Sequence, residues 1–134
     1  YHMNDYAAAL GIANLTGFKQ RIYNRRKIAK YYKNELKNMD GISLFEENPD
    51  RKSSYWQFCF HVEKRNDFIR ALASQGITAS VIHQRIDRNA IFGGIKKDLV
   101  NQARFDKTQI HIPIHDGIDM EKAEYIIKTI KRGW

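Results

Sequence analysis

The sequence predicts an α+β domain in which a long N-terminal helix precedes a small, mainly antiparallel sheet with helices on one face. Three observations support this prediction. Apolar residues recur at three-, four- and seven-residue steps in residues 4–38, as on one face of a helix. Apolar and polar residues alternate in residues 55–63, as in a half-buried strand. Later helical and strand-like segments alternate along the chain, which is typical of a sheet covered by helices.

Residues 4–38 are predicted to form one continuous helix, with Asn4 or Asp5 as its cap and Asp40-Gly41 after its end. Its apolar stripe consists of Leu15, Phe18, Ile22, Ala29, Tyr32 and Leu36. The opposite face is basic and carries Lys19, Arg21, Arg25, Arg26, Lys27, Lys30, Lys33 and Lys37. Because an isolated helix is only marginally stable, this one needs a further surface to lie on. We therefore divide the chain into residues 1–40, the long helix, and residues 41–134, a small α+β domain.

The small domain is predicted to begin with two strands, residues 42–45 and 55–63, separated by a polar loop that contains Pro49. Trp56, Phe58, Phe60 and Val62 share one face of the second strand. A helix capped by Asn66 or Asp67 follows and ends at Gly76.

The remaining segments repeat the pattern of strand and helix. Residues 77–83 are a predicted strand, residues 95–103 a helix after Gly93-Gly94, and residues 109–114 a strand that Pro113 interrupts. The last helix begins after the cap Asp119. Its buried positions are Ala123, Ile126, Ile127 and Ile130.

Composition limits the functional classes. The chain has 134 residues, a formal net charge of +8 and 43% hydrophobic residues, so it can build a core and general disorder is excluded. Its apolar stretches are shorter than the roughly 20 residues that a membrane span needs. The single Cys59 excludes an intramolecular disulfide and fits a reducing, cytoplasmic location. The positive charge is suited to a polyanion, such as nucleic acid or acidic lipid, or to a phosphorylated small molecule.

Two functional interpretations follow from the basic helix and the aromatic strand. Trp56, Phe58 and Phe60 could stack on single-stranded nucleic acid beside the basic helix, as in a free-standing binding module. The same alternation is the ordinary pattern of a strand with one face in the core, and base rates favour that second interpretation. We therefore keep nucleic-acid binding as the alternative function and expect the aromatic face to be core.

Other candidate chemistry is limited. His111 and His115 are four residues apart, but Pro113 prevents the helix that would bring them together, so no metal site is expected. Cys59 lies within a strand pattern that offers no activating context for a thiol. The segment from His83 to Asp87 follows a predicted strand, where functional loops gather, and Arg85 could bind a phosphate or carboxylate. An incidental ion pair in an exposed loop explains that segment equally well.

Several strings together resemble one known family. They are residues 1–11 (YHMNDYAAALG), 25–32 (RRKIAKYY), 54–56 (SYW), 76–83 (GITASVIH) and 109–113 (QIHIP), followed by the isoleucine-rich last helix. Their order and spacing resemble the C-terminal part of the DegT/DnrJ/EryC1/StrS family, which are pyridoxal-phosphate-dependent sugar-nucleotide aminotransferases. The resemblance extends over essentially the whole chain.

The resemblance implies a fold and an activity. It implies the small C-terminal domain of a type I fold aminotransferase, with residues 1–40 as a helix between the large and small domains. The intact enzyme would move an amino group, from glutamate, onto a keto-sugar nucleotide by means of pyridoxal phosphate. The family's Schiff-base lysine lies upstream of the matched part. We therefore assign no catalytic residue here and expect this chain alone to be inactive and to bind no cofactor.

The resemblance also implies site residues. His2 matches a position that reaches the cofactor phosphate of the neighbouring subunit in a homodimer. His83, Arg85 and Asp87 lie in a segment similar to the family's substrate-facing H-x-R-N-D loop, and Ile86 replaces its asparagine. No membrane association is expected, and nucleic acid is the less favoured partner.

Overall fold

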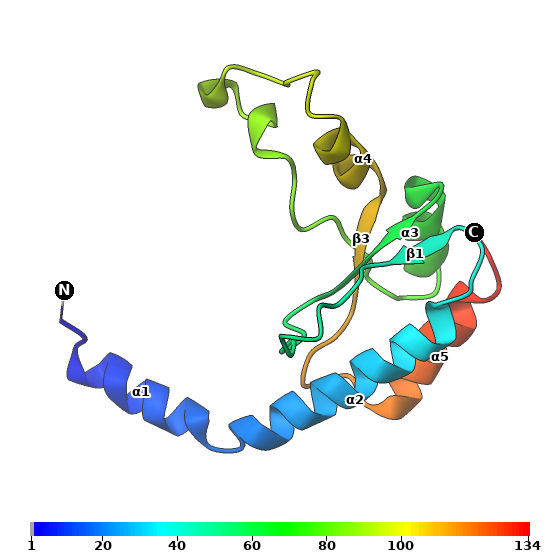
Figure 1. The fold of residues 1–134 in the computed structure, drawn as a ribbon. Helices are drawn as coiled ribbons and strands as arrows, with labels where there is room; N and C mark the ends of the chain where they lie inside the picture. Colours follow the sequence, from blue (N-terminus) through cyan, green and yellow to red (C-terminus); the bar gives the residue numbers. More distant parts are fainter. Residues whose placement is uncertain (1) are drawn as a thin grey trace.

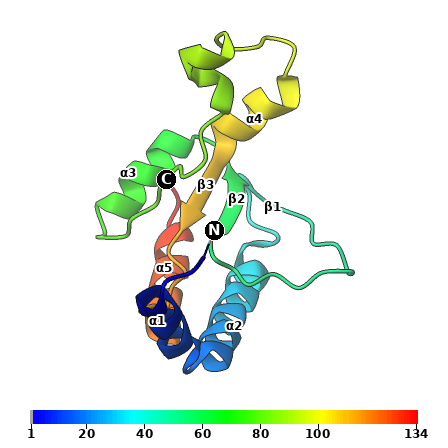
Figure 2. The same ribbon diagram turned by 90° about the vertical axis from the view of Figure 1, so that its left-hand side faces the viewer.

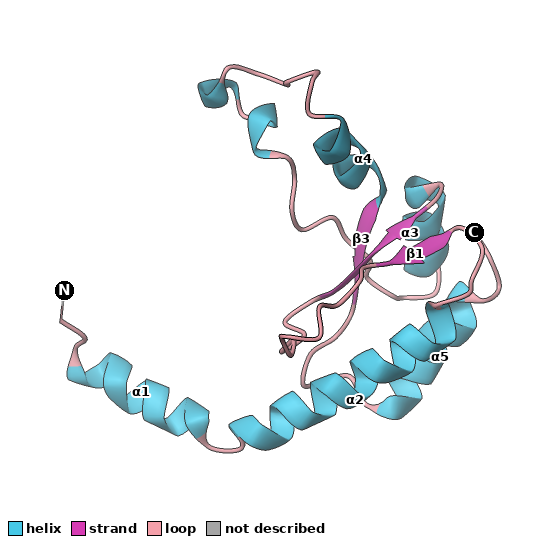
Figure 3. Cartoon of the chain, in the orientation of Figure 1, coloured by secondary structure: helices cyan, strands magenta, loops and turns pink. Residues whose placement is uncertain are grey.

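The computed structural model describes residues 2–134 and consists of short helices around a small sheet (Figures 1 and 3). The elements in chain order are α1 (Asp5–Leu15), α2 (Phe18–Leu36), β1 (Ile42–Leu44), β2 (Phe58–Val62), α3 (Arg65–Ala73), the 3-10 turns η1 (Ile86–Arg88) and η2 (Ala90–Phe92), α4 (Val100–Thr108), β3 (Gln109–Ile112) and α5 (Met120–Ile130).

The N-terminal helix is two helices, so the prediction of one continuous helix over residues 4–38 is wrong. Thr16 is extended and Gly17 is left-handed, with a φ of 74°, which a residue without Cβ adopts readily. The Arg21 guanidinium donates a 2.7 Å hydrogen bond to the Thr16 carbonyl and so closes the break. None of the α1 side chains, all of which the structure describes, is buried. Figure 1 shows α1 extending away from the sheet.

The sheet is antiparallel, as predicted, in the order β1-β2-β3. Phe60 pairs with Leu44 on one side and with Ile110 on the other. The second strand begins at Phe58 rather than at residue 55, because Tyr55 has a φ of 49° and breaks the extended backbone.

Residues 77–83 are not the strand that their alternation predicts. Ile77 and Ala79 are buried on the core side, as a period of two requires. Only Ser80 pairs with the sheet, through two backbone hydrogen bonds to His111 of 3.0 and 3.1 Å. The alternation in residues 77–83 therefore reflects which side chains are buried. The segment itself forms one bridge to β3 and then leaves the edge of the sheet.

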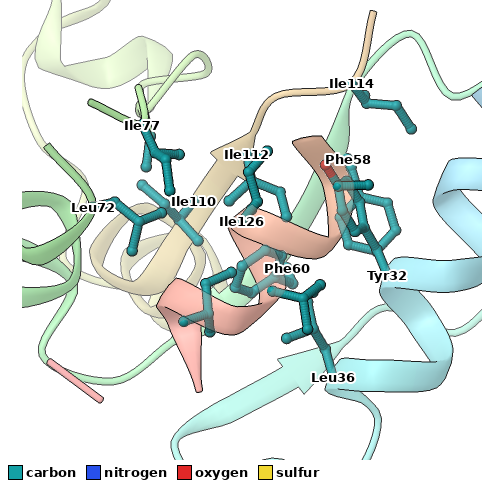
Figure 4. Close-up of a cluster of buried hydrophobic side chains, with 14 of the residues drawn as sticks. Tyr32, Leu36, Phe58, Phe60, Leu72, Ile77, Ile110, Ile112, Ile114 and Ile126 are labelled. Carbon is teal, nitrogen blue, oxygen red and sulfur yellow. The ribbon is translucent and has the colours of Figure 1, made fainter. Parts of the chain in front are cut away.

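The hydrophobic core lies between one face of the sheet and α2, α3 and α5 (Figure 4). Phe58, Phe60 and Val62 point into it from β2, and Tyr32 and Leu36 from α2. Each such side chain stabilises the fold by about 1.5–3 kcal/mol through removal of apolar surface from water. This confirms the core interpretation for Phe58, Phe60 and Val62 but not for Trp56, which precedes β2 and is exposed.

The opposite face of the sheet is only partly covered. His61 of β2 points there, and the ring of Phe105 from α4 lies 5.7 Å from its imidazole ring. The main layer of helices is therefore on one face, with α4 at the edge of the other.

Some helices begin where the sequence signals predict, and others do not. The Asp119 carboxylate accepts a 2.9 Å hydrogen bond from the backbone N–H of Lys122, which confirms the predicted cap of α5. The predicted caps of α3 are wrong, because that helix begins at Arg65, directly after the left-handed Lys64. Predicted from residue 95, α4 begins at Val100. The helices of residues 2–134 are all too short or too polar to cross a membrane.

Candidate functional site

The segment predicted to face substrate lies in a lobe, residues 84–106, that projects from the sheet between the Ser80 bridge and β3 (Figures 1 and 2). The lobe contains η1, η2 and most of α4. The structure brings Arg85 and Asp87 together within this lobe and places His83 at its base, beside Trp56 and Gln57.

Arg85 and Asp87 bind each other. The Nε and Nη2 atoms of Arg85 each donate a 2.6 Å hydrogen bond to the Asp87 carboxylate, a two-bond geometry that a planar guanidinium favours. Their side chains are only 5% and 7% exposed. The Arg85 guanidinium and, next, the Lys96 backbone N–H hold the pKa of Asp87 well below its usual range. Arg85 and Asp87 therefore form the ion pair of the second interpretation, but the pair is buried and not in an exposed loop.

A second buried carboxylate, which the sequence did not indicate, supports the first pair. One oxygen of Asp106 accepts a 3.1 Å hydrogen bond from the Arg85 backbone N–H, and the other accepts a 2.6 Å bond from Arg88. The Lys96 backbone completes the network, since its N–H donates to Asp87 at 2.8 Å and its carbonyl accepts from Arg85 at 3.0 Å. We call Arg85, Asp87, Arg88, Lys96 and Asp106 the clamp.

His83 remains exposed and adjoins an exposed tryptophan. Its Nε2 lies 3.2 Å from the side-chain oxygen of Gln57, and its ring centre lies 6.4 Å from that of Trp56. Its backbone carbonyl accepts a hydrogen bond from Gln109, a fully buried residue of β3. Gln109 and Asp106 therefore hold the backbone at the His83 carbonyl and at the Arg85 N–H, directly after an imidazole that is open to solvent.

The aromatic strand does not offer the surface that nucleic-acid stacking needs. Trp56 is 69% exposed, but Phe58 and Phe60 are buried beneath α2, α3 and α5. One exposed ring is not the row of stacked aromatic groups of a single-strand binding module. The alternative function, binding of single-stranded nucleic acid, therefore loses two of its three stacking residues.

His2 is exposed and lies just before α1, whose first turn is capped by a 2.8 Å hydrogen bond from the Ala7 backbone N–H to Asn4. Its imidazole is therefore free of the core and not part of the lobe.

Cys59 is half-buried in β2, and burial raises the pKa of its thiol to about 11. A thiol that is protonated at neutral pH is a poor nucleophile.

The sequence did not indicate a pocket of about 320 Å³ between α2 and residues 114–120. At its edge Asp116 pairs with Arg25 at 3.0 Å and with Arg21 at 3.7 Å. One carboxylate thus neutralises part of the positive charge of α2 at this pocket.

Comparison with known proteins gives consistent results. The family model described as the DegT/DnrJ/EryC1/StrS aminotransferase family matches residues 1–131. A curated relative, the UDP-4-amino-4,6-dideoxy-N-acetyl-beta-L-altrosamine transaminase of Campylobacter jejuni, is 26% identical over 140 residues; the match covers 97% of this chain and 36% of the relative.

Solved structures, a sugar aminotransferase among them, share the fold. CalS13 from Micromonospora echinospora superimposes with a TM-score of 0.93 and 28% identity, over 98% of this chain and 36% of that protein. AtS13 from Actinomadura melliaura gives a TM-score of 0.93 and 27% identity, over 99% of this chain and 36% of that protein. The chain thus spans about a third of the length of the relatives that it matches.

Proposed function

Because the chain belongs to the DegT/DnrJ/EryC1/StrS aminotransferase family, we propose that it is the C-terminal part of a pyridoxal-phosphate-dependent enzyme that aminates a keto-sugar nucleotide. The observation that carries this proposal is the match of the family model to residues 1–131, together with a shared fold at 28% identity. In this proposal residues 1–40 connect the large domain to the small domain formed by residues 41–134.

The substrate side of the proposal rests on the lobe. His83 offers an exposed imidazole at the base of the lobe, which can donate or accept a hydrogen bond to a sugar hydroxyl or a phosphate oxygen. Arg85 and Asp87 are engaged with each other, so we propose that they bind substrate indirectly, by shaping the loop that carries His83.

The cofactor side of the proposal rests on His2. When it is bound, pyridoxal phosphate supplies the electron sink that amino-group transfer requires. The donor chemistry of this chain fits part of a phosphate site, because the exposed imidazole of His2 can donate one hydrogen bond to a phosphate oxygen. A phosphate dianion needs several donors, so most of its site would come from the remainder of the enzyme.

The remaining parts of the proposal concern the intact protein. We propose a cytoplasmic homodimer in which His2 of one subunit reaches the cofactor of the other, with glutamate as the amino donor. The 134-residue chain alone would not transaminate, since the family's Schiff-base lysine is outside the matched part.

The test compares the intact protein with the 134-residue chain. The intact protein is expected to show the visible absorbance of bound pyridoxal phosphate, to lose it on addition of glutamate, and to regain it with a keto-sugar nucleotide. The separate chain is expected to show none of these changes. An intact protein that binds no pyridoxal phosphate, or a chain that transaminates alone, would contradict the proposal.

A histidine variant tests the cofactor side. His2→Ala in the intact protein is expected to weaken pyridoxal phosphate about tenfold, the loss of one charge-assisted hydrogen bond. The matched control is His115→Ala, an exposed histidine at the turn after β3. Equal cofactor affinity in both variants would remove His2 from the site.

A further inference from the structure

The lobe buries charged side chains and exposes apolar ones, which is the reverse of the usual distribution. Within residues 84–106, all of which the structure describes, the buried side chains are charged: Arg85, Asp87 and Asp106. Its large apolar side chains that face solvent are Ile86, Ile91, Phe92, Ile95, Leu99 and Val100. The conformation of the lobe therefore depends on the clamp and not on a hydrophobic core.

The clamp connects distant points of the lobe. Asp87, near its start, binds the backbone of Lys96 in its middle, and Asp106, at its end, binds the backbone of Arg85 at its start. Arg88 adds a side-chain bond to Asp106. Two carboxylates and two guanidiniums thus satisfy one another and three backbone groups.

Removal of one member would leave its partners unpaired. With Asp106 absent, the buried Arg85 N–H would have no acceptor, and Arg88 would lose its 2.6 Å contact. Unpaired buried polar groups are much less stable than paired ones, so the lobe would open rather than keep its shape.

We propose that Asp106 is a positioning residue: together with Asp87 it holds the lobe, and through the Arg85 backbone it fixes the orientation of His83 toward substrate. Asp106 itself touches no substrate in this proposal. It lies on α4, 19 residues beyond Asp87, outside the loop that the sequence indicates. The substrate part of this inference rests on the proposed function, whereas the structural part does not.

Hydrogen exchange of the full 134-residue chain tests the structural part. Asp106→Ala is expected to speed exchange of the amides of residues 85–96 about tenfold or more, with β2 and α5 unchanged. The matched control is Asp98→Ala, which removes an exposed carboxylate from the same lobe and is expected to change nothing.

A second variant distinguishes loss of the clamp from misfolding of the whole domain. Arg88→Ala removes a side chain that is 52% exposed, so the core stays intact, yet it breaks one arm of the clamp. It is expected to speed exchange in the same amides, by a smaller factor than Asp106→Ala. Unchanged exchange in both variants would overturn the proposal, and so would an increase that extends equally into β2 and α5.

Kinetics of the intact enzyme test the positioning part. Asp106→Ala is expected to raise the KM for the keto-sugar nucleotide about tenfold and to leave the glutamate half-reaction unchanged, with partial rescue by Asp106→Asn, which keeps an acceptor for the Arg85 N–H. An unchanged KM together with faster exchange would overturn the positioning role. A wild-type enzyme without a glutamate half-reaction would instead overturn the proposed function and leave the exchange result valid.

Discussion

The core and the lobe are held together by different forces. Around Phe60, apolar side chains from β2, β3, α2, α3 and α5 pack together, and the driving force is the removal of apolar surface from water. In the lobe, two carboxylates accept hydrogen bonds of 2.6 Å from two guanidiniums and one of 3.1 Å from the Arg85 backbone N–H.

The difference predicts how each region responds to change. Hydrophobic packing is not directional, so a core variant loses stability in proportion to the volume removed and spreads the loss over the whole domain. A buried ion-pair network depends on every partner, so a single change opens it locally. A binding surface on the lobe can therefore be altered without loss of the fold.

The largest expected effect is in the core. Phe60→Ala should lower the free energy of unfolding by about 3–5 kcal/mol, because the fully buried ring leaves a cavity beside Phe68. Urea denaturation followed by circular dichroism measures the change. Trp56→Ala is the control from the same segment, expected to change stability by less than about 0.5 kcal/mol since that ring is exposed. Equal losses in both variants would contradict the assignment of the core face.

A smaller effect is expected where the core meets the turn after β3. The buried Tyr32 hydroxyl donates a 3.0 Å hydrogen bond to the Pro113 carbonyl, and burial raises the pKa of Tyr32, which stays protonated. Tyr32→Phe should lower the free energy of unfolding by about 1 kcal/mol. Tyr23→Phe, which alters an exposed ring on the same helix, is the control. No difference between the two in urea denaturation would show that this hydrogen bond contributes nothing.

The smallest expected effect is a pH dependence of stability that differs between the core and the lobe. Burial lowers the pKa of His61 and of His111, so the unfolded chain takes up protons first. The free energy of unfolding is then highest above the ordinary histidine pKa of 6.5 and falls modestly as the pH drops below it.

The lobe should respond at lower pH. The lowered pKa of Asp87 stabilises the clamp fully above the ordinary aspartate value of 3.8, and this contribution is lost as the pH falls through the lowered pKa of the folded state. Thermal unfolding between pH 7 and 5, with hydrogen exchange of the lobe from pH 5 downward, distinguishes the two steps. A lobe that opens already between pH 7 and 5 would contradict the separation.

Local patterns in the sequence predicted much of the fold. The alternation from Phe58 to Val62 gave the central strand and its buried face, and the Asp119 signal gave the start of α5. Both depend on neighbours a few residues apart, which a sequence displays directly. The family resemblance, confirmed over residues 1–131, combined several such strings in order.

Longer-range features were not predictable. The prediction of one helix over residues 4–38 includes Gly17, although this glycine separates α1 from α2. The segment from Ile77 to Ala79 has the period of a strand, but only contact with His111 shows that a single bridge forms. The single bridge depends on a residue far along the chain, whereas the break at Gly17 depends on its own left-handed backbone.

The same division applies to the candidate site. The sequence by itself determined that a histidine, an arginine and an aspartate occupy positions 83, 85 and 87, in a segment that resembles a substrate-facing loop. Only the tertiary structure decided that Arg85 and Asp87 bind each other, that Asp106 joins them, and that His83 remains exposed. The physical reason is that a charge selects its partner by distance and burial in the folded chain, and the sequence specifies neither for residues as far apart as Arg85 and Asp106.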